Sequence, residues 1–370
     1  MYLKDLVDIQ MGQSPDSKFY NYDKIGLPFY QGKADFGRIN PTPKIWCSKS
    51  KKEAKPNDIL ISVRAPVGDL NINNEQSCIG RGLAAITCRP DVDMMYLYYH
   101  LKYLKPQLRH ISTGSTFESI NRNQLEYLII DYKPYSEQIK ISNILQVVQR
   151  QIEVKKKLLR LYDLIIKSRF DEFNKNNDIV KVLKLEDICS SIVRGPFGSA
   201  LKVENFVKKS DTSVKVYEQS NAIQRSAAIG SRYISREHYE SLRRFKCKPG
   251  DIIMSCSGTI GKLFILPNDA EEGIINQALC KFTLGKDLLP EVFLLYMDIL
   301  IGNIETKGSG IKNISAVKFI KNLEISVPPI EAQNKLLIEL NQINKLKSDV
   351  QKSIDETQLL MDSLMQEYFG

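Results

Sequence analysis

Two carboxylates that precede apolar runs are the first residues in this chain that could do chemistry. Asp58 and Asp251 each follow a Pro-Asn or Pro-Gly turn, a position where a nuclease could hold a divalent metal. A nuclease would also need a second acid and a lysine nearby, and neither aspartate is followed by a Glu-x-Lys pattern. The histidines, at 100, 110 and 238, stand far apart in the sequence. We therefore predict neither a metal site nor a nuclease centre.

Two short motifs could belong to a methyltransferase or to a phosphate-binding enzyme. The motif VPPIE (327–331) has two prolines, but it lacks the Asn or Asp before them and the aromatic residue after them that adenine methylation requires. The motif SGTIGKL (257–263) is shorter than a phosphate-binding loop and has no Ser or Thr after Lys262. A helix start and a tight turn explain these motifs better, so we predict no catalytic centre and no bound cofactor.

Basic residues are in excess, with 52 Lys and Arg against 43 Asp and Glu and a net charge of +9. A charge of this size suits a polyanionic partner such as DNA. Many unrelated proteins carry a similar charge, so the charge alone does not assign a partner.

The elements that would position such residues occur twice in the chain. The run LKDLVDIQMGQSP (3–15) matches LEDICSSIVRGPFGS (185–199), and KPNDILISVRAPVG (55–68) matches KPGDIIMSCSGTIG (248–261). Self-similarity at an offset of about 194 residues indicates a duplicated structural unit. Each copy alternates short β-rich runs with helical patterns, which predicts a mixed α/β domain.

Each copy is followed by a long predicted helix, at 137–173 and at 332–369. Apolar residues recur there at the alternating four- and three-residue spacing of a coiled coil. This row of positions, the predicted seam, includes Arg169 and ends at Phe173 in the first copy and at Tyr368 in the second. Two separate amphipathic helices would show a similar pattern, but matching seams favour an antiparallel pair.

Chain length and cysteine content indicate the number of domains and the compartment. A chain of 370 residues favours two domains. Seven scattered cysteines without a CxxC pair favour reduced thiols in the cytoplasm, and the absence of a run of about 18 apolar residues predicts no membrane association. We predict a mixed α/β (α+β) fold with pseudo-two-fold symmetry, in which domains at 1–134 and 176–329 alternate with spacer helices at 135–175 and 330–370 that pair as an antiparallel coiled coil.

Further motifs stand in a fixed order along the chain with the two KPxDI runs: GQSP (12–15), GLPFYQGKADFG (26–37), the GST and GSG turns, PYSEQ (134–138) and PPIEAQ (328–333). This order of motifs, occurring twice, resembles the specificity subunit (HsdS) of Type I restriction–modification systems over essentially the whole chain. The second copy departs from the first around 194–245, which weakens the transfer of residues to that copy.

The resemblance implies a non-catalytic subunit in which each target-recognition domain recognises one half of a bipartite, asymmetric double-stranded DNA target. It also implies two modification subunits, which carry S-adenosylmethionine and dock on the helices, and restriction subunits that cleave. Two alternatives stay open: a stand-alone DNA methyltransferase or restriction–methylation fusion, and a coiled-coil scaffold without a DNA role.

Candidate DNA contacts are basic or polar side chains at loop tips beside glycines, where the main chain can approach a phosphate. Ordinary solvated loops have a similar composition. The candidates are Gln13, Ser14, Gln31, Lys33, Arg38, Arg64, Arg81, Thr113, Ser115 and Thr116 in the first domain, and Arg194, Ser199, Lys202, Gln219, Asn221, Ser257, Thr259, Asn276, Gln277, Lys307 and Ser309 in the second.

Overall fold

A computed structural model describes residues 1–112, 118–175, 181–306 and 317–370. The chain divides into two compact units. Unit 1 consists of Met1–Arg160 and Ser348–Gly370, and unit 2 of Leu161–Lys347. Each unit therefore contains part of both long helices, α4 (Tyr135–Lys175) and α11 (Ile330–Phe369).

In its described residues, unit 1 contains two β-sheets and three short α-helices besides its parts of α4 and α11. One sheet is antiparallel with the order β1-β9-β6-β7, and the other has the order β2-β4-β3-β8-β5, in which β3 and β8 are parallel. The apolar run of residues 59–61 shows no alternation with polar residues because all four residues of β6 are buried. The elements are β1 Val7–Met11, β2 Tyr20–Asn21, β3 Leu27–Tyr30, β4 Ile45–Cys47, β5 Glu53–Ala54, β6 Ile59–Ser62, β7 Leu70–Ile72, β8 Ser77–Ile79, β9 Leu83–Cys88, α1 Met94–Tyr103, α2 Lys105–Ile111 and α3 Arg122–Glu126.

Unit 2 repeats both sheet topologies. Its sheets have the orders β11-β19-β16-β17 and β12-β14-β13-β18-β15, with β13 and β18 parallel, and a two-stranded β10-β20 ladder is added. The predicted duplication and the mixed α/β class are therefore confirmed. The elements are β10 Lys181–Lys184, α5 Leu185–Ile188, β11 Cys189–Arg194, β12 Phe206–Val207, β13 Ser213–Tyr217, α6 Gln219–Ile223, β14 Tyr233–Ser235, α7 Arg236–Ser241, β15 Lys246–Cys247, β16 Ile252–Ser255, β17 Leu263–Ile265, β18 Gly273–Ile275, β19 Leu279–Leu284, α8 Pro290–Thr306, α10 Val317–Lys321 and β20 Glu324–Val327.

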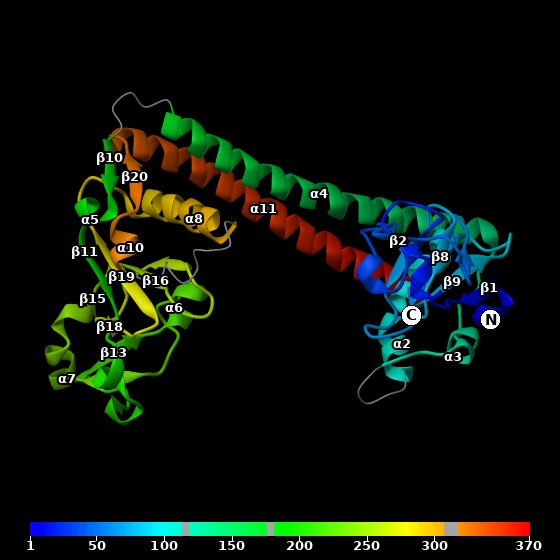
Figure 1. Cartoon of the computed structure of the whole chain (residues 1–370), viewed down its shortest axis with the longest axis horizontal. Helices are drawn as coiled ribbons and strands as arrows, with labels where there is room; N and C mark the ends of the chain where they lie inside the picture. Colours follow the sequence, from blue (N-terminus) through cyan, green and yellow to red (C-terminus); the bar gives the residue numbers. More distant parts are fainter. Residues whose placement is uncertain (113–117, 176–180, 307–316) are drawn as a thin grey trace. The chain divides into compact units, whose positions relative to one another are not determined.

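The main core of unit 2 joins the β16–β19 sheet to the long helices through α8, which runs beside α11 (Figure 1). Phe293 and Met297 of α8 share one buried cluster with Phe282 of β19 and with Leu336 and Leu340 of α11. Burial of these large side chains, at about 1.5–3 kcal/mol each, is what attaches the helices to the domain. Among the described residues, no helix is long and apolar enough to cross a membrane.

A buried glutamine in the first turn of each long helix fixes the point where the helix leaves its domain. The side-chain nitrogen of Gln138 donates to the carbonyl oxygens of Asp91 and Lys133, and its oxygen accepts the N–H of Asp93 at 2.8 Å. Gln333 makes three corresponding bonds at the start of α11. Both side chains are 0% exposed. The PYSEQ and PPIEAQ motifs therefore encode the same polar anchor twice.

The two long helices pack together in each unit. In unit 1, Leu145 and Ile152 of α4 share a buried cluster with Ile354 and Met361 of α11. In unit 2, the last part of α4 shares a cluster with the first part of α11 through Phe170 and its neighbours. The start of one helix thus meets the end of the other, and the predicted antiparallel pairing is confirmed.

The predicted seam is wrong at Arg169 of α4, and at the end of α11 the predicted Tyr368 is only partly buried against the cluster. Arg169 is exposed, whereas the next residue, Phe170, is buried. In α11, Met365 and Phe369 are buried more deeply than the predicted seam residue Tyr368. A straight α-helix drifts by about 20° per heptad from a 3.5-residue repeat, so the contact moves to the adjacent residue after several turns.

Candidate nucleic-acid interface

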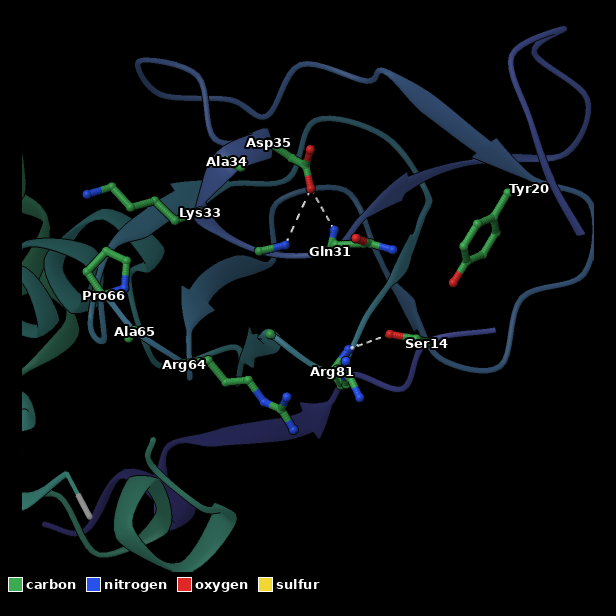
Figure 2. Close-up of a pocket in the computed structure, with 12 residues that line it drawn as sticks. Ser14, Tyr20, Gln31, Lys33, Ala34, Asp35, Arg64, Ala65, Pro66 and Arg81 are labelled. Atoms are coloured by element: carbon green, nitrogen blue, oxygen red, sulfur yellow. Dashed lines mark hydrogen bonds between the residues drawn. The ribbon is translucent and has the colours of Figure 1, made fainter. Parts of the chain in front are cut away.

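Five of the predicted contact residues line one hollow of about 850 Å³ in unit 1, the central hollow. Its predicted residues are Ser14, Gln31, Lys33, Arg64 and Arg81. They lie in the loops that follow β1, β3, β6 and β8. Figure 2 shows Arg64 and Arg81 on one side of the hollow, and Lys33 and Gln31 on the other. A smaller neighbouring hollow is also lined by both arginines, so they form a wall between the two.

Glycine brings the loop after β1 against the loop that carries Arg81. The N–H of Gly12 donates to the carbonyl of Leu83 at 2.9 Å, and a Cβ at Gly12 would lie only 2.2 Å from the carbonyl oxygen of Gly80. No larger residue fits there unless the backbone moves. Ser14 Oγ then accepts the N–H of Arg81 at 3.3 Å, which ties the two loops together (Figure 2).

The acidic residue on the rim of the central hollow is bonded to the backbone. Asp35 Oδ2 accepts the N–H groups of Gln31 at 2.7 Å and Gly32 at 3.3 Å, as Figure 2 shows. This carboxylate shapes the loop after β3 and holds the Gln31 backbone in place. Its Oδ2 atom is therefore occupied by two N–H groups of its own loop.

Lys33 is engaged in an ion pair, unlike the two arginines. Its Nζ lies 2.9 Å from Asp69 Oδ2, and Lys105 pairs with the other oxygen of the same carboxylate. Although burial alone would raise the pKa of Asp69, hydrogen bonds from Lys105 and Lys33 lower it below its ordinary value. Within the parts of the chain that the structure describes, Arg64 and Arg81 are exposed and have no acidic partner. The arginines therefore form no ion pair among these residues, although Glu118 lines the smaller hollow beside them.

The loop after β6 recurs after β16 in unit 2 with different side chains. Ser62 and Ser255 each donate from Oγ to a carbonyl four residues ahead and accept an N–H seven residues ahead. This match places Ser257 at the position of Arg64. Thr259, two residues further on, is exposed at the tip of the same loop.

The loop before β9 likewise recurs before β19. The N–H groups of Gly80 and Asn276 each donate to the tyrosine that ends the neighbouring strand, and their carbonyls accept the N–H of the first residue of the next strand. Gln277 therefore occupies the position of Arg81 and is exposed. Gly195 matches Gly12: its Cβ would lie 1.8 Å from the carbonyl oxygen of Asn276.

Two further candidates in unit 2 lie near these loops. Arg194 Nε donates to the carbonyl of Gln277 at 3.4 Å, and its guanidinium lies 4.9 Å from the ring centre of Phe197. Gln219 lies beside the loop after β16, since a Cβ at Gly258 would be 3.1 Å from its Nε2. The structure thus brings Arg194, Gln219, Ser257 and Gln277 near loops that correspond to those of the central hollow.

One prediction needs correction. Asn221 is 0% exposed, and its amide donates to the carbonyls of Ser226 and Ile229, so it is a structural residue that DNA cannot reach. Its residue type does not distinguish a bond within the protein from one to a ligand. Arg38 lies outside the central hollow and forms an ion pair with Glu153 of α4, but its side chain is exposed, so its contact with DNA stays a prediction.

The other candidates are more dispersed. Gln13 is exposed beside Ser14, Lys202 pairs with Glu204 at 3.3 Å, and Ser199 falls in a short 3-10 helix, Gly198–Leu201. Thr113, Ser115, Thr116, Lys307 and Ser309 lie outside the described residues.

Sequence reasoning missed several residues that line the central hollow. Tyr20 and Pro66 contribute to it, and the hydroxyl of Tyr20 donates to the carbonyl of Pro15 at 2.8 Å. Pro66 could have been found from its place two residues after Arg64 in a repeated motif, whereas Tyr20 has no sequence signal. In the described parts of the chain, no group of three or more His, Cys, Asp or Glu side chains could hold a metal ion.

Two curated proteins of Methanocaldococcus jannaschii are similar to parts of this chain. The putative type I restriction enzyme MjaX specificity subunit is 45% identical over 150 residues, which cover 40% of this chain and 35% of that protein. The type I restriction enzyme MjaIX specificity subunit is 29% identical over 224 residues, covering 55% and 51%. The chain thus spans from about a third to about half of the length of these relatives.

Two solved structures and one family model are also similar to this chain. The crystal structure of a Type I restriction-modification system S subunit from M. genitalium matches 100% of this chain and 95% of that chain, with a TM-score of 0.54 and 14% identity, and has a similar fold. The HsdS subunit from Thermoanaerobacter tengcongensis is 46% identical over 41% of this chain and 37% of that chain, with a TM-score of 0.38. The model of the Type I restriction modification DNA specificity domain matches residues 1–161 and again residues 177–357. With two copies of this domain over most of its length, the chain belongs to the Type I restriction modification DNA specificity family.

Proposed function

We propose that this chain is the DNA-specificity subunit of a Type I restriction–modification complex, and that each α/β domain recognises one half of a bipartite, asymmetric target. One observation carries the proposal: the family's domain occurs twice, with the same loop geometry and different side chains at the loop tips. Side chains at base edges determine sequence, while the scaffold and phosphate contacts fix position. Equal scaffolds with unequal loop tips suit two half-sites of different sequence.

The proposed role is non-catalytic and cytoplasmic. Two modification subunits, which would carry S-adenosylmethionine, would bind along α4 and α11, and restriction subunits would join the assembly. Large apolar side chains exposed on both helices support such contacts, since apolar residues gathered on a surface often mark an interface. They include Val147, Val154 and Leu164 of α4 and Ile338 and Leu359 of α11.

The proposed division of labour assigns recognition to 1–134 and 176–329 and spacing to 135–175 and 330–370. Net positive charge supplies salt-dependent attraction to any duplex, and the loop side chains supply discrimination. Binding by the chain alone is expected to be weak, and assembly with the modification subunits is expected to make it specific.

Mapping of methylated sites tests the proposal in a host that carries the chain and its modification subunits. Replacement of residues 1–134 by the corresponding domain of a relative should change one half of the target and leave the other half intact. Replacement of residues 181–327 is the matched exchange and should change the opposite half. An exchange that alters both halves would contradict independent recognition. Micromolar binding of S-adenosylmethionine to the purified chain would instead favour the stand-alone methyltransferase.

A further inference from the structure

We propose that Arg64 and Arg81 recognise guanine in the half-site bound by unit 1, through two positions that carry no arginine in unit 2. This inference rests on the proposed function of the chain as a DNA-specificity subunit. It assigns a base to two residues that come from separate loops and meet at one wall of the central hollow.

Both arginines can bind a ligand, since no ion pair within the described residues engages them. The nearby cation Lys33 is held by Asp69, which it shares with Lys105, whereas neither arginine forms an ion pair with a described residue, including Glu118 of the smaller hollow. A guanidinium has five N–H donors in a planar fork, so an unpaired one can still make two parallel bonds to a single partner.

The backbone beneath each arginine is fixed. Ser14 Oγ accepts the N–H of Arg81, and the carbonyl of Glu118 accepts the N–H of Ala65 at 3.0 Å, next to Arg64. Arg64 also forms a β-bridge with Ser119. Because separate segments hold each loop, the two side chains start from defined positions, and less ordering is required when a ligand binds.

The chemistry of the duplex decides what such a pair recognises. In the major groove, guanine presents O6 and N7 as adjacent acceptors, which match the arginine fork in a bidentate contact. A phosphate would also attract arginine, but it carries no sequence information and accepts a lysine as a substitute. The proposal therefore predicts base discrimination that depends on the guanidinium and not on charge alone.

The second copy of the domain carries other residues at the positions of the two arginines. Ser257 and Gln277 occupy the positions of Arg64 and Arg81 on an equivalent backbone. Glutamine matches the N6 and N7 edge of adenine, so a glutamine at this position favours a different base. The exchange Arg81→Gln places the second domain's residue in the first domain.

The experiment uses the full chain in complex with its modification subunits and a library of DNA duplexes with a randomised central segment. Bound duplexes are selected and sequenced for the wild type and for Arg64→Lys, Arg81→Lys and Arg81→Gln. Arg122→Lys is the matched control, because Arg122 is exposed, pairs with Glu126 on α3 and lies outside the hollow.

The wild type should select guanine in one half-site, and each lysine variant should reduce that preference by about 5- to 150-fold at one position. Arg81→Gln should shift the preference at its position toward adenine. The half-site bound by unit 2 should stay unchanged in every variant, which shows that the complex is assembled. The other positions of the half-site bound by unit 1 should stay unchanged as well, which shows that unit 1 is folded.

Two results would overturn the inference, and they differ in what else they imply. Lysine variants that keep the wild-type preference, or a wild-type half-site without guanine, would leave the arginines as phosphate contacts only. A wild-type complex that selects no sequence at all would remove the proposed function as well.

Discussion

Lys155 of α4 donates to Thr357 Oγ1 of α11 at 2.6 Å and to the carbonyl of Ser353 at 3.1 Å. Thr357 is buried, and the pair lies within the apolar contact between the helices in unit 1. An amine in such a contact needs its acceptor, so a shift of one helix along the other would leave Lys155 without a partner. The pair therefore favours one register of the helices.

Removal of the Thr357 hydroxyl should reveal the energetic coupling between Lys155 and Thr357. Thr357→Val should lower the free energy of unfolding by roughly 1.5–3 kcal/mol, because a charged donor loses one of its two hydrogen bonds and keeps only the carbonyl of Ser353. Adding Lys155→Met should recover most of the loss, since the donor is then absent as well. Urea unfolding of both single variants and the double variant measures the coupling, and additive effects would contradict it.

A charge placed in the buried contact between α4 and α11 should destabilise unit 1. Ile152 and Ile354 are 1% and 5% exposed in the same cluster, so Ile152→Glu or Ile354→Glu buries an unpaired carboxylate. Each should cost about 3 kcal/mol or more. Val154→Glu is the control on the same helix, because Val154 is 62% exposed. Melting temperatures that fall equally in the control would count against the pairing.

Loss of a polar anchor should destabilise the unit that contains it. Gln138→Leu leaves two carbonyls and one N–H without their side-chain partner in a buried site, at a cost of about 3 kcal/mol. Gln333→Leu should have a similar effect on unit 2. Gln151→Leu, at an exposed site on α4, should change little. Hydrogen exchange of the backbone amides in each unit would locate the loss, and its appearance in the wrong unit would refute the assignment.

Acid should weaken unit 1 through His100. This ring is 2% exposed and stacks on Phe369 with centroids 4.7 Å apart, and its Nδ1 has no hydrogen-bond partner among the described residues. Burial lowers its pKa from 6.5 to about 4. The unfolded chain then binds a proton that the folded chain does not, so stability is lost as the pH falls from about 6.5 toward 4, by about 3 kcal/mol at most.

Substitution of the ring should flatten this pH dependence. His100→Phe keeps a stacked ring and removes the titrating group, so its stability should fall less between pH 7 and pH 4.5 than that of the wild type. His110→Phe, at an exposed histidine of α2, should keep the wild-type slope. Denaturant unfolding at several pH values gives the comparison, and parallel slopes for wild type and His100→Phe would exclude His100 as the cause.

The long helices could be predicted from the sequence because a pattern repeated over many turns outweighs local exceptions. The position of the contact could not be followed to the end, since the drift that replaces Arg169 with Phe170 accumulates over several heptads. The pairing of the short strands could not be predicted from the sequence either. A strand as short as Tyr20–Asn21 carries no periodicity, so which neighbour it joins depends on the packed domain.

For the candidate site, the sequence identified residue types but not their surroundings. Arg64 and Arg81 were both predicted, yet only the fold brings them to one wall. Gln219 and Asn221 look equivalent in the sequence, but Asn221 bonds to backbone groups several residues away and is buried by them. Such bonds depend on loop geometry, which one sequence does not reveal.

Unit 1 consists of two segments that are far apart in the sequence, so it cannot be completed until the second segment has been synthesised. Unit 2 consists of contiguous residues, whereas unit 1 needs Ser348–Gly370 to cover Leu145 and Ile152 of α4. A ribosome delivers that segment only after all of unit 2, so the domain translated first is completed last. Until then the nascent chain presents an uncovered apolar stripe, the kind of surface that aggregates or binds chaperones. A stop codon before Ser348 would therefore impair the N-terminal domain, although every residue of that domain had been made.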